Sequence, residues 1–148
     1  KNYRNIDFFG RGPWENTWDR KVGSLLGVYK QNVDNQYFPY ARPQEGGSKT
    51  DVRWVRFTDN KGRGVEFEFN KDLLSFSALP YSLDDLDPEV DKKQYHSGEL
   101  EKRDITYVYM DYLQSGVGGV DSWYTPAIEQ YKLKFKDYDY SFWIKPLK

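Results

Sequence analysis

The residues best suited to ligand chemistry in this sequence lie in a glycine-rich stretch, GVGGVDSW, at positions 116–123. It places Asp121 and Ser122 directly before Trp123. An indole ring offers a flat apolar face that can pack on the C–H face of a sugar, and short polar side chains can bond the sugar hydroxyls. The same tryptophan could instead plug the protein core. The residues alone leave both readings open.

Other candidates for catalysis are weaker. Glycosidases generally use paired carboxylates, and Glu15, Glu45 and Asp121 are available, but no spacing shows that any two of them meet. His96 is the single histidine and stands in a polar stretch without a nucleophile-elbow pattern, which predicts a surface residue. The chain has no cysteine, which excludes disulfides, thiolate metal sites and a cysteine nucleophile.

Neither a metal nor a nucleotide cofactor is predicted. The acidic residues between positions 84 and 91 lack the glycine and ligand spacing of a calcium loop, and they suit the start of a short helix. Ser82 followed by Asp85 approximates a capping pattern there. The G-x-G of residues 10–12 lacks the third glycine of a dinucleotide fingerprint, so we expect it to end a strand and turn a corner.

Composition narrows the class of protein. The 148 residues carry a net charge of −1, which gives no electrostatic case for a nucleic-acid or anionic-membrane partner. No apolar run approaches the roughly 18 residues of a membrane span. Aromatic residues make up 18% of the chain, and such side chains favour pleated, half-buried surfaces. An all-β protein is therefore the first expectation.

Alternation with period two supports that expectation. It occurs in GVEFEFN, DITYVYMDY, YDYSFWIKP, TDVRWVRFTD, SLLGVYKQNV, LLSFSALPY and QYKLKFK. Turn residues separate the runs, and DNKG at 59–62 predicts a hairpin. The pattern predicts a single domain over residues 1–148, a sandwich or barrel of roughly eight to twelve strands.

Two irregular segments accompany the strands. Residues 10–18 carry Trp14 and Trp18 beside polar side chains, which indicates a polar-aromatic surface or an interface. Residues 37–47 are punctuated by prolines and are too irregular for a central strand. Arg42, Gln44 and Glu45 in that segment either bind a ligand or tie down the loop, and the second reading is favoured.

Four motifs in this order resemble one known family. They are GRGPWENTWDRKVGSLLGVY, VDNQYFPYARPQEGGSKTDVRW, LSFSALPYSLDDLD and YMDYLQSGVGGVDSW, and the resemblance runs from Phe8 to Pro146. They resemble the C-terminal domain of large bacterial β-galactosidases of glycoside hydrolase family 2, often called the β-galactosidase small chain. The resemblance implies an all-β supersandwich similar to galactose mutarotases, and a position as the last of five domains.

The resemblance also implies a division of labour. The family's catalytic carboxylates lie in a central TIM barrel, so no catalytic residue is expected in this chain, and the Mg and Na ions that such enzymes use would bind elsewhere. The expected partners are galactosides and the other domains of the same β-galactosidase. The sequence does not fix the compartment, and the bacterial cytoplasm and periplasm both remain open.

Within the family pattern GG-D-D-S-W, the tryptophan reaches the active site and packs against the sugar, chiefly at the aglycone position. Trp123 matches it, with Asp121 and Ser122 as supporting loop residues. Val120 stands where the pattern has its first aspartate, Trp14 where relatives often have His or Gln, and Gly46 where they commonly have Asn.

Two other functions remain as alternatives. One is a stand-alone carbohydrate-binding module that uses Trp123. The other is an aldose 1-epimerase, a mutarotase-like enzyme, which uses a His and Glu pair and would have to employ His96. A shared fold does not by itself fix function.

Overall fold

The computed structural model describes residues 3–87, 96–118 and 125–148. Eight β-strands make up its regular structure, with only short helical turns between them, so the predicted all-β sandwich is confirmed. The strands are β1 (Asn5–Gly12), β2 (Leu25–Asn32), β3 (Lys49–Val52), β4 (Trp54–Thr58), β5 (Gly64–Phe69), β6 (Leu74–Leu79), β7 (Tyr107–Asp111) and β8 (Phe142–Leu147).

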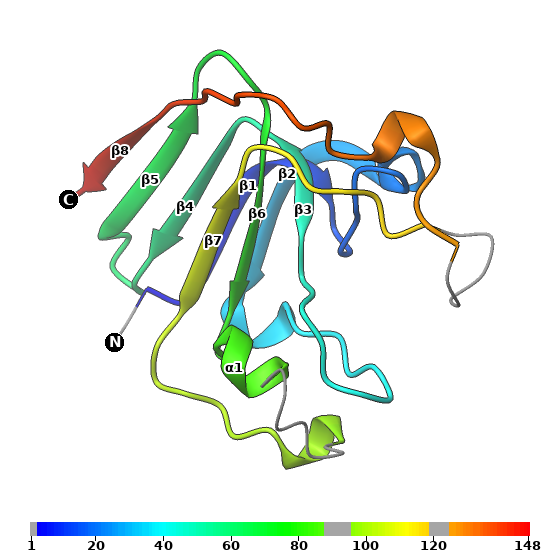
Figure 1. Ribbon diagram of the computed structural model, residues 1–148. Helices are drawn as coiled ribbons and strands as arrows, with labels where there is room; N and C mark the ends of the chain where they lie inside the picture. Colours follow the sequence, from blue (N-terminus) through cyan, green and yellow to red (C-terminus); the bar gives the residue numbers. More distant parts are fainter. Residues whose placement is uncertain (1–2, 88–95, 119–124) are drawn as a thin grey trace.

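The strands form two antiparallel sheets that face each other (Figure 1). The larger sheet has the order β2-β1-β4-β5-β8, and the smaller has the order β3-β6-β7. Every pairing is antiparallel. The likeness to galactose mutarotases and the limits of the domain stay predictions.

The core lies between the sheets and follows the alternation of the sequence. β1 alternates buried and half-buried residues along its length, because one face of the strand packs inward. β6 is buried at all six positions. The fully buried apolar residues at the centre are Ile6, Phe8, Val33, Val52, Val55, Phe76 and Ala78.

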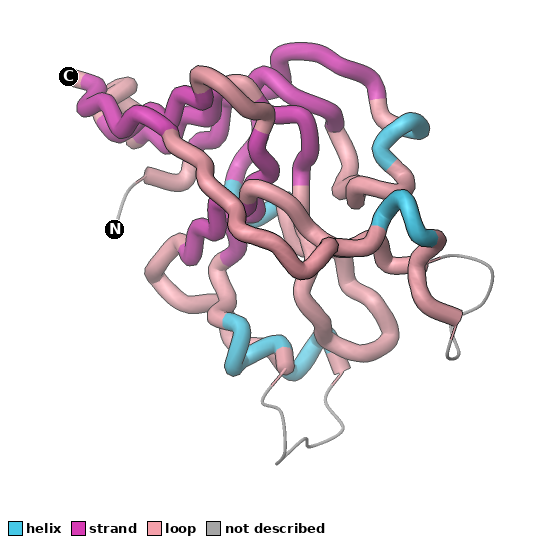
Figure 2. The backbone as a smooth tube through the Cα atoms, turned by 45° about the horizontal axis from the view of Figure 1, so that its top comes forward, coloured by secondary structure: helices cyan, strands magenta, loops and turns pink. Residues whose placement is uncertain are grey.

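Helical turns fill the connections, drawn in cyan in Figure 2. Among the described residues only α1 (Leu83–Leu86) is an α-helix, and it begins with the predicted capping box, in which Ser82 and Asp85 bond each other's backbone N–H groups. The described 3-10 turns are η1 (Lys21–Gly23), η2 (Val33–Asn35), η4 (Ser97–Glu99) and η5 (Glu129–Tyr131). None of the helices among the described residues is long and apolar enough to cross a membrane.

The DNKG hairpin is confirmed between β4 and β5. Gly62 has φ +80°, and the Asp59 backbone N–H donates to the Arg63 carbonyl at 2.8 Å. The Asp59 carboxylate also accepts from the Lys61 and Arg63 amides. TDVRWVRFTD, by contrast, forms two strands and not one, because β3 ends at Val52 in one sheet and β4 begins at Trp54 in the other.

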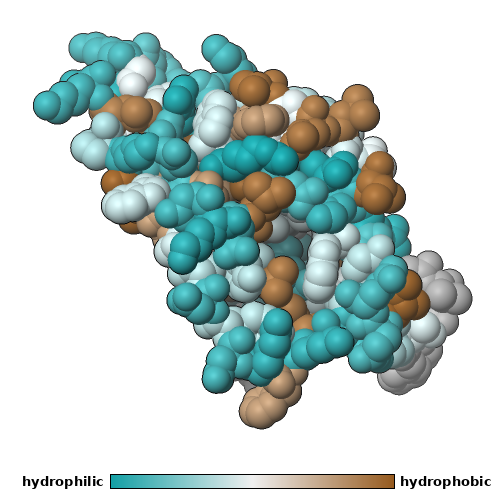
Figure 3. Space-filling view, turned by 90° about the horizontal axis from the view of Figure 1, so that it is seen from above, coloured by the Kyte–Doolittle hydropathy of each residue, from teal (hydrophilic) through white to brown (hydrophobic). Residues whose placement is uncertain are grey.

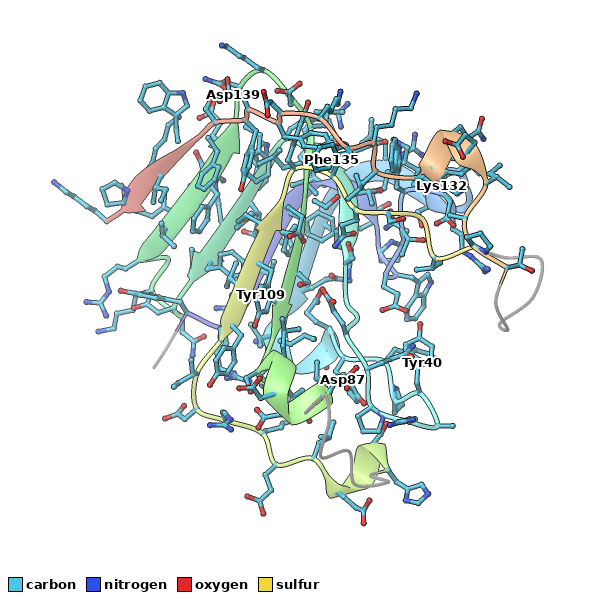
Figure 4. The ribbon with its side chains drawn as sticks, in the orientation of Figure 1. Tyr40, Asp87, Tyr109, Lys132, Phe135 and Asp139 are labelled. Carbon is cyan, nitrogen blue, oxygen red and sulfur yellow. The ribbon has the colours of Figure 1, made fainter. Side chains whose placement is uncertain are left out.

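The strand predicted for QYKLKFK is wrong. Residues 129–131 form η5, and residues 132–141 cross one end of the sandwich without regular structure. Leu133 and Phe135 point to solvent there, and Phe135 is fully exposed (Figure 4). The alternation has no sheet to bury it, so no strand forms. Seen from above in Figure 3, this end shows hydrophobic side chains in small groups among hydrophilic ones.

Candidate functional site

The residues predicted to contact a sugar, Asp121, Ser122 and Trp123, lie outside the described residues. Their roles therefore stay predictions. The structure does describe both flanks of this stretch, up to Gly118 and again from Thr125. The candidate site is accordingly the base from which residues 119–124 leave the sandwich.

The first flank is held by Asp19. Its carboxylate accepts hydrogen bonds from the Gly118 backbone N–H at 3.0 Å and the Thr17 hydroxyl at 2.8 Å. The neighbouring Arg20 guanidinium donates to the Gly118 carbonyl at 3.2 Å. Both backbone polar groups of Gly118 are thus bound by consecutive residues of a different connection. We call residues 17–20 the clasp.

Asp19 is ionised in this arrangement. Partial burial raises the pKa of its carboxyl group, but hydrogen bonds from the Thr17 hydroxyl and from the backbone N–H groups of Asp19, Val117 and Gly118 outweigh that effect and leave the pKa below its ordinary value. An ionised carboxylate is the stronger acceptor for backbone N–H groups. The clasp is therefore charge-assisted at neutral pH.

The clasp also reaches the second flank. The Trp18 ring packs edge-on against Tyr131, with ring centroids 5.8 Å apart. Tyr131 in turn accepts a hydrogen bond from the Gly116 backbone N–H at 2.7 Å through its carbonyl. Residues on both sides of the 119–124 stretch therefore meet at the same four-residue segment, and Figure 1 shows the connections side by side.

The structure explains why two positions of the motif, 116 and 118, are occupied by glycine. Gly118 has φ +80°, and a Cβ there would stand 3.1 Å from the Thr125 carbonyl oxygen. A Cβ at Gly116 would stand 2.8 Å from an Asp19 carboxylate oxygen and 2.9 Å from Tyr131 Cβ. Close approach and a left-handed backbone both require glycine here. The two ends of the stretch are thus drawn into a narrow base.

The clasp is itself anchored by an ion-pair group. The Asp51 carboxylate accepts from Arg11 Nε at 2.6 Å and from Lys21 Nζ at 2.7 Å. Arg11 also donates to the Ser24 carbonyl at 2.9 Å. Burial raises the pKa of Asp51, but the bonds from Lys21 and Arg11 prevail and lower it. These bonds fix the 13–24 connection to β1 and to the end of β3.

A second polar network lies beside the clasp and holds residues 36–47. The Glu15 carboxylate accepts from the Tyr40 hydroxyl and from the Gly47 backbone N–H, the latter at 2.7 Å. Tyr40 is labelled in Figure 4. These bonds tether the irregular segment, whereas Arg42, Gln44 and Glu45, favoured by sequence for that role, are exposed. Glu15 is thus a structural ligand of the loop.

A buried lysine, which the sequence did not single out, belongs to this network. Lys49 is 2% exposed, and its ammonium group donates to the Gln36 side chain at 3.1 Å and to the Gly47 carbonyl at 3.0 Å. Burial lowers the pKa of Lys49 to about 8, and the charge of Glu15 opposes this shift. The sequence signal for the burial of Lys49 was its place in a strand-like segment. A lysine in such a segment is normally expected to face solvent, so the burial was not predicted.

Asp111 is a second ionisable group that the sequence did not single out. Burial raises the pKa of its carboxyl group, and the nearby charge of Glu45 raises it further, against a hydrogen bond from the Gln114 side chain. Gln114 also accepts from the Ser48 hydroxyl at 3.3 Å. The end of β7 is thereby linked to the start of β3.

The remaining candidates do not assemble into a reactive centre among the described residues. Trp14 is 76% exposed, as expected of a surface aromatic, whereas Trp18 is half-buried in the clasp. His96 lies 3.4 Å from Glu99, but the two side chains are 80% and 55% exposed at η4, which provides no enclosed site for an epimerase. No group of three or more potential metal ligands occurs in the ranges that the structure describes.

Sequence comparison supplies the family. The family described as beta galactosidase small chain matches residues 1–144. This chain belongs to the β-galactosidase small-chain family. The first part of the resemblance drawn from the motifs is thereby confirmed.

Curated relatives of this chain are named β-galactosidases. A β-galactosidase from Priestia megaterium is 40% identical over 98% of this chain, and the match covers 14% of the relative. BgaC, a β-galactosidase from Bifidobacterium adolescentis, is 38% identical over 88% of this chain and 12% of its own length. A β-galactosidase from Streptococcus thermophilus is 32% identical over 98% of this chain, and the match covers 14% of that relative. The chain therefore spans about one seventh or less of these relatives.

The clasp generates a first prediction. Asp19→Asn should lower the free energy of unfolding by about 1 kcal/mol, because an amide accepts the Gly118 N–H more weakly than a carboxylate does. Denaturant titration measures the loss, and amide exchange should accelerate at Val117 and Gly118. The loss should vanish as the pH falls well below about 4, since protonation of Asp19 then removes the charge in the unsubstituted protein too.

Asp139→Asn is the matched control, since Asp139 is exposed on the 132–141 crossing (Figure 4). Equal effects of the two substitutions on stability and on Gly118 exchange would show that the clasp does not hold the loop base.

The buried lysine generates a second prediction. Between pH 8 and pH 10.5 the folded protein releases the Lys49 proton before the unfolded chain does, so the free energy of unfolding should rise with pH across this window. The rise attributable to Lys49 is at most about 3 kcal/mol. It is measured as the difference between the unsubstituted protein and Lys49→Met in urea titrations at several pH values, with the exposed Lys71→Met as control. Parallel curves for the protein and Lys49→Met would refute a lowered pKa.

Proposed function

We propose that this chain is a non-catalytic domain of a glycoside hydrolase family 2 β-galactosidase, and that it presents Trp123 to the sugar bound at an active site built by other parts of the enzyme. The observation that carries the proposal is the family match over residues 1–144, with Trp123 in the position of the family's loop tryptophan. The clasp adds physical support, because it fixes both flanks of the loop to the sandwich.

In the proposed enzyme, hydrolysis of terminal β-D-galactosyl residues follows a retaining mechanism with two carboxylates supplied by a TIM barrel. The domain takes the last position in the chain and completes one wall of the pocket. Carbohydrate and the remaining domains are its partners. Its own contribution is positioning: a stacked ring holds the aglycone or an acceptor in place and leaves bond cleavage to the carboxylates.

The described part of the chain agrees with a supporting role. Glu15 is occupied by Tyr40 and Gly47, Asp19 by Thr17 and Gly118, and Asp51 by Arg11 and Lys21. Carboxylates bound in this way orient loops and are not poised for proton transfer to a glycosidic oxygen. These three carboxylates are thus structural.

The third prediction tests the role of Trp123 in an intact enzyme. A chimera is made from the Priestia megaterium β-galactosidase by replacing its matching segment with this chain. Trp123→Ala in the chimera should raise KM for lactose by about 5- to 30-fold, equivalent to the loss of 1–2 kcal/mol of stacking, and should reduce transglycosylation. Trp123→Phe, which keeps an aromatic face, is the matched control.

Initial-rate kinetics with lactose separate KM from kcat, and product analysis at high lactose measures transfer. The proposal fails if KM and the transfer fraction are both unchanged by Trp123→Ala while the unsubstituted chimera is active.

The fourth prediction concerns the isolated chain. One wall of a pocket does not enclose a sugar, so NMR titration with galactose or lactose at tens of millimolar should give no saturating shifts near Trp123. Saturation in the low millimolar range would favour the stand-alone binding module instead. Polarimetry of fresh α-galactose checks the epimerase alternative, and a rate above the buffer control would revive it.

A further inference from the structure

The two sheets of the sandwich differ in width. Five strands of the larger sheet face three strands of the smaller one. In Figure 1, β5 and β8 extend beyond β7, and in the described part of the chain β7 pairs only with β6. We call the inner face of β5 and β8, together with the unpaired edge of β7, the open flank.

The inner face of the open flank is apolar. Phe67 packs against the buried Phe57, with ring centroids 6.0 Å apart, so it points toward the smaller sheet. Residues directly opposite each other in an antiparallel pair share a face, and Phe67 is opposite Ile144 while Val65 is opposite Pro146. Ile144 therefore points inward, yet it is 61% exposed. An inward-facing isoleucine so exposed indicates a missing cover.

A hollow lies beside this uncovered surface. Its volume is about 270 Å³, and its walls include Phe57, Val65 and Phe67 of the larger sheet, Val108 of the smaller one, and Ile105 just before β7. Ile105 is 57% exposed. The hollow therefore separates the two sheets at the side of β7 that has no neighbouring strand.

The other side of the sandwich is covered where β3 lies over β1. There β3 is the outer strand of the smaller sheet. Val52 on β3 and Phe8 on β1 are fully buried. Beyond β1 only β2 remains on that side, and its inward-facing Leu25, opposite Gly12, is 78% exposed. On the β7 side the uncovered part of the larger sheet is wider, because both β5 and β8 extend past β7.

We propose that the open flank is filled by a β-strand from the remainder of a longer β-galactosidase polypeptide, which pairs with the free edge of β7 and places alternate apolar side chains on Val65, Phe67 and Ile144. Neighbouring strands lie about 4.8 Å apart and stacked sheets about 10 Å apart, so a strand beside β7 faces the inner side of the larger sheet along β5 and the adjoining side of β8. An unpaired edge supplies a row of N–H and C=O groups for such addition.

The length of the β-galactosidase relatives indicates where the strand comes from. The match to this chain covers only 12–14% of three β-galactosidase relatives, so most of such a polypeptide lies outside the family segment seen here. The inference rests on the proposal that this chain acts as one domain of such an enzyme. It does not depend on Trp123.

The first test is hydrogen exchange of the isolated chain and of the Priestia megaterium chimera, followed by mass spectrometry. In the isolated chain, peptides covering β7 should exchange faster than peptides covering β4, which pairs on both sides. In the chimera the β7 peptides should slow at least about tenfold, while β4 stays unchanged. Equal rates for β7 in the two proteins overturn the proposal.

Two results in the isolated chain also overturn it, whatever the chimera does. One is a monomer in sedimentation whose β7 amides are as protected as those of β4, because the edge is then not free. The other is a dimer at tens of micromolar with β7 protected, because a second copy is then the occupant.

The second test uses neighbouring substitutions with equal starting exposure. Ile144 and Trp143 are 61% and 60% exposed and point to opposite faces of β8. In the isolated chain, Ile144→Lys and Trp143→Lys should each change the melting temperature little. In the chimera, Ile144→Lys should lower it by about 5 °C or more, because the charge is then buried, whereas Trp143→Lys should not.

Equal effects of the two substitutions in the chimera overturn the proposal. The readouts are protection and melting temperature, so they separate from the kinetic test of Trp123. Protected β7 amides with an unchanged lactose KM for Trp123→Ala would sink the sugar-contacting role alone, and the converse pattern would sink the open-flank proposal alone.

Discussion

The contact of Phe76 with two rings of the opposite sheet is the interaction on which the rest of this structure depends. Phe76 lies on β6, and it meets Phe8 of β1 and Phe57 of β4 edge-on at centroid distances of 5.2 Å and 6.1 Å. All three rings are buried. Edge-to-face packing of aromatic rings fixes both the spacing and the relative orientation of the sheets. The strands that the contact holds together carry the connections at the ends of the sandwich.

Outside that core, charged side chains hold the connections in place. β1 and β3 carry Arg11 and Asp51 to the end of the sandwich, where their ion pair with Lys21 fixes the 13–24 connection. That connection presents Asp19 and Arg20 to Gly118. Half-buried ion pairs add little net stability on their own. Their effect here is geometric, since each bond restrains the direction in which the next segment runs.

The sequence predicted the fold class because its signals were local. Alternation in GVEFEFN and the glycine of DNKG depend on neighbours in the chain, and both formed as expected. QYKLKFK alternates equally well but formed no strand, because alternation specifies a face and cannot supply a partner sheet. The capping box at Ser82 succeeded for the same local reason. Pairing order and the unequal width of the sheets depend on long-range contacts and were not predictable.

The site shows the same division between local and long-range information. Gly118 of the glycine-rich motif has a left-handed backbone, with φ +80°. Nothing near residue 118 in the sequence pointed to Asp19, because the two are joined only through the fold. Lys49 was missed because burial of a lysine reverses the usual expectation for charge. Its ammonium group is retained because Gln36 and Gly47 bond it, which replaces part of the water that burial removes.

The region near Gly118 and the flank formed by β5 and β8 differ in how completely the chain satisfies them, and the difference suits the proposed place of the domain inside a larger enzyme. Near Gly118 every described carboxylate of the clasp and its anchor is satisfied within the chain, so that region is organised without help. Along β5 and β8 inward-facing apolar residues remain uncovered, so that region is not. In the proposed role the loop contacts a sugar, and restraint of its two flanks would serve that role, because a displacement of about 1 Å is costly in positioning. A flank that joins other polypeptide needs only an apolar surface and a free edge. The internally bonded base near Gly118 and the uncovered apolar flank therefore occupy different parts of one sandwich.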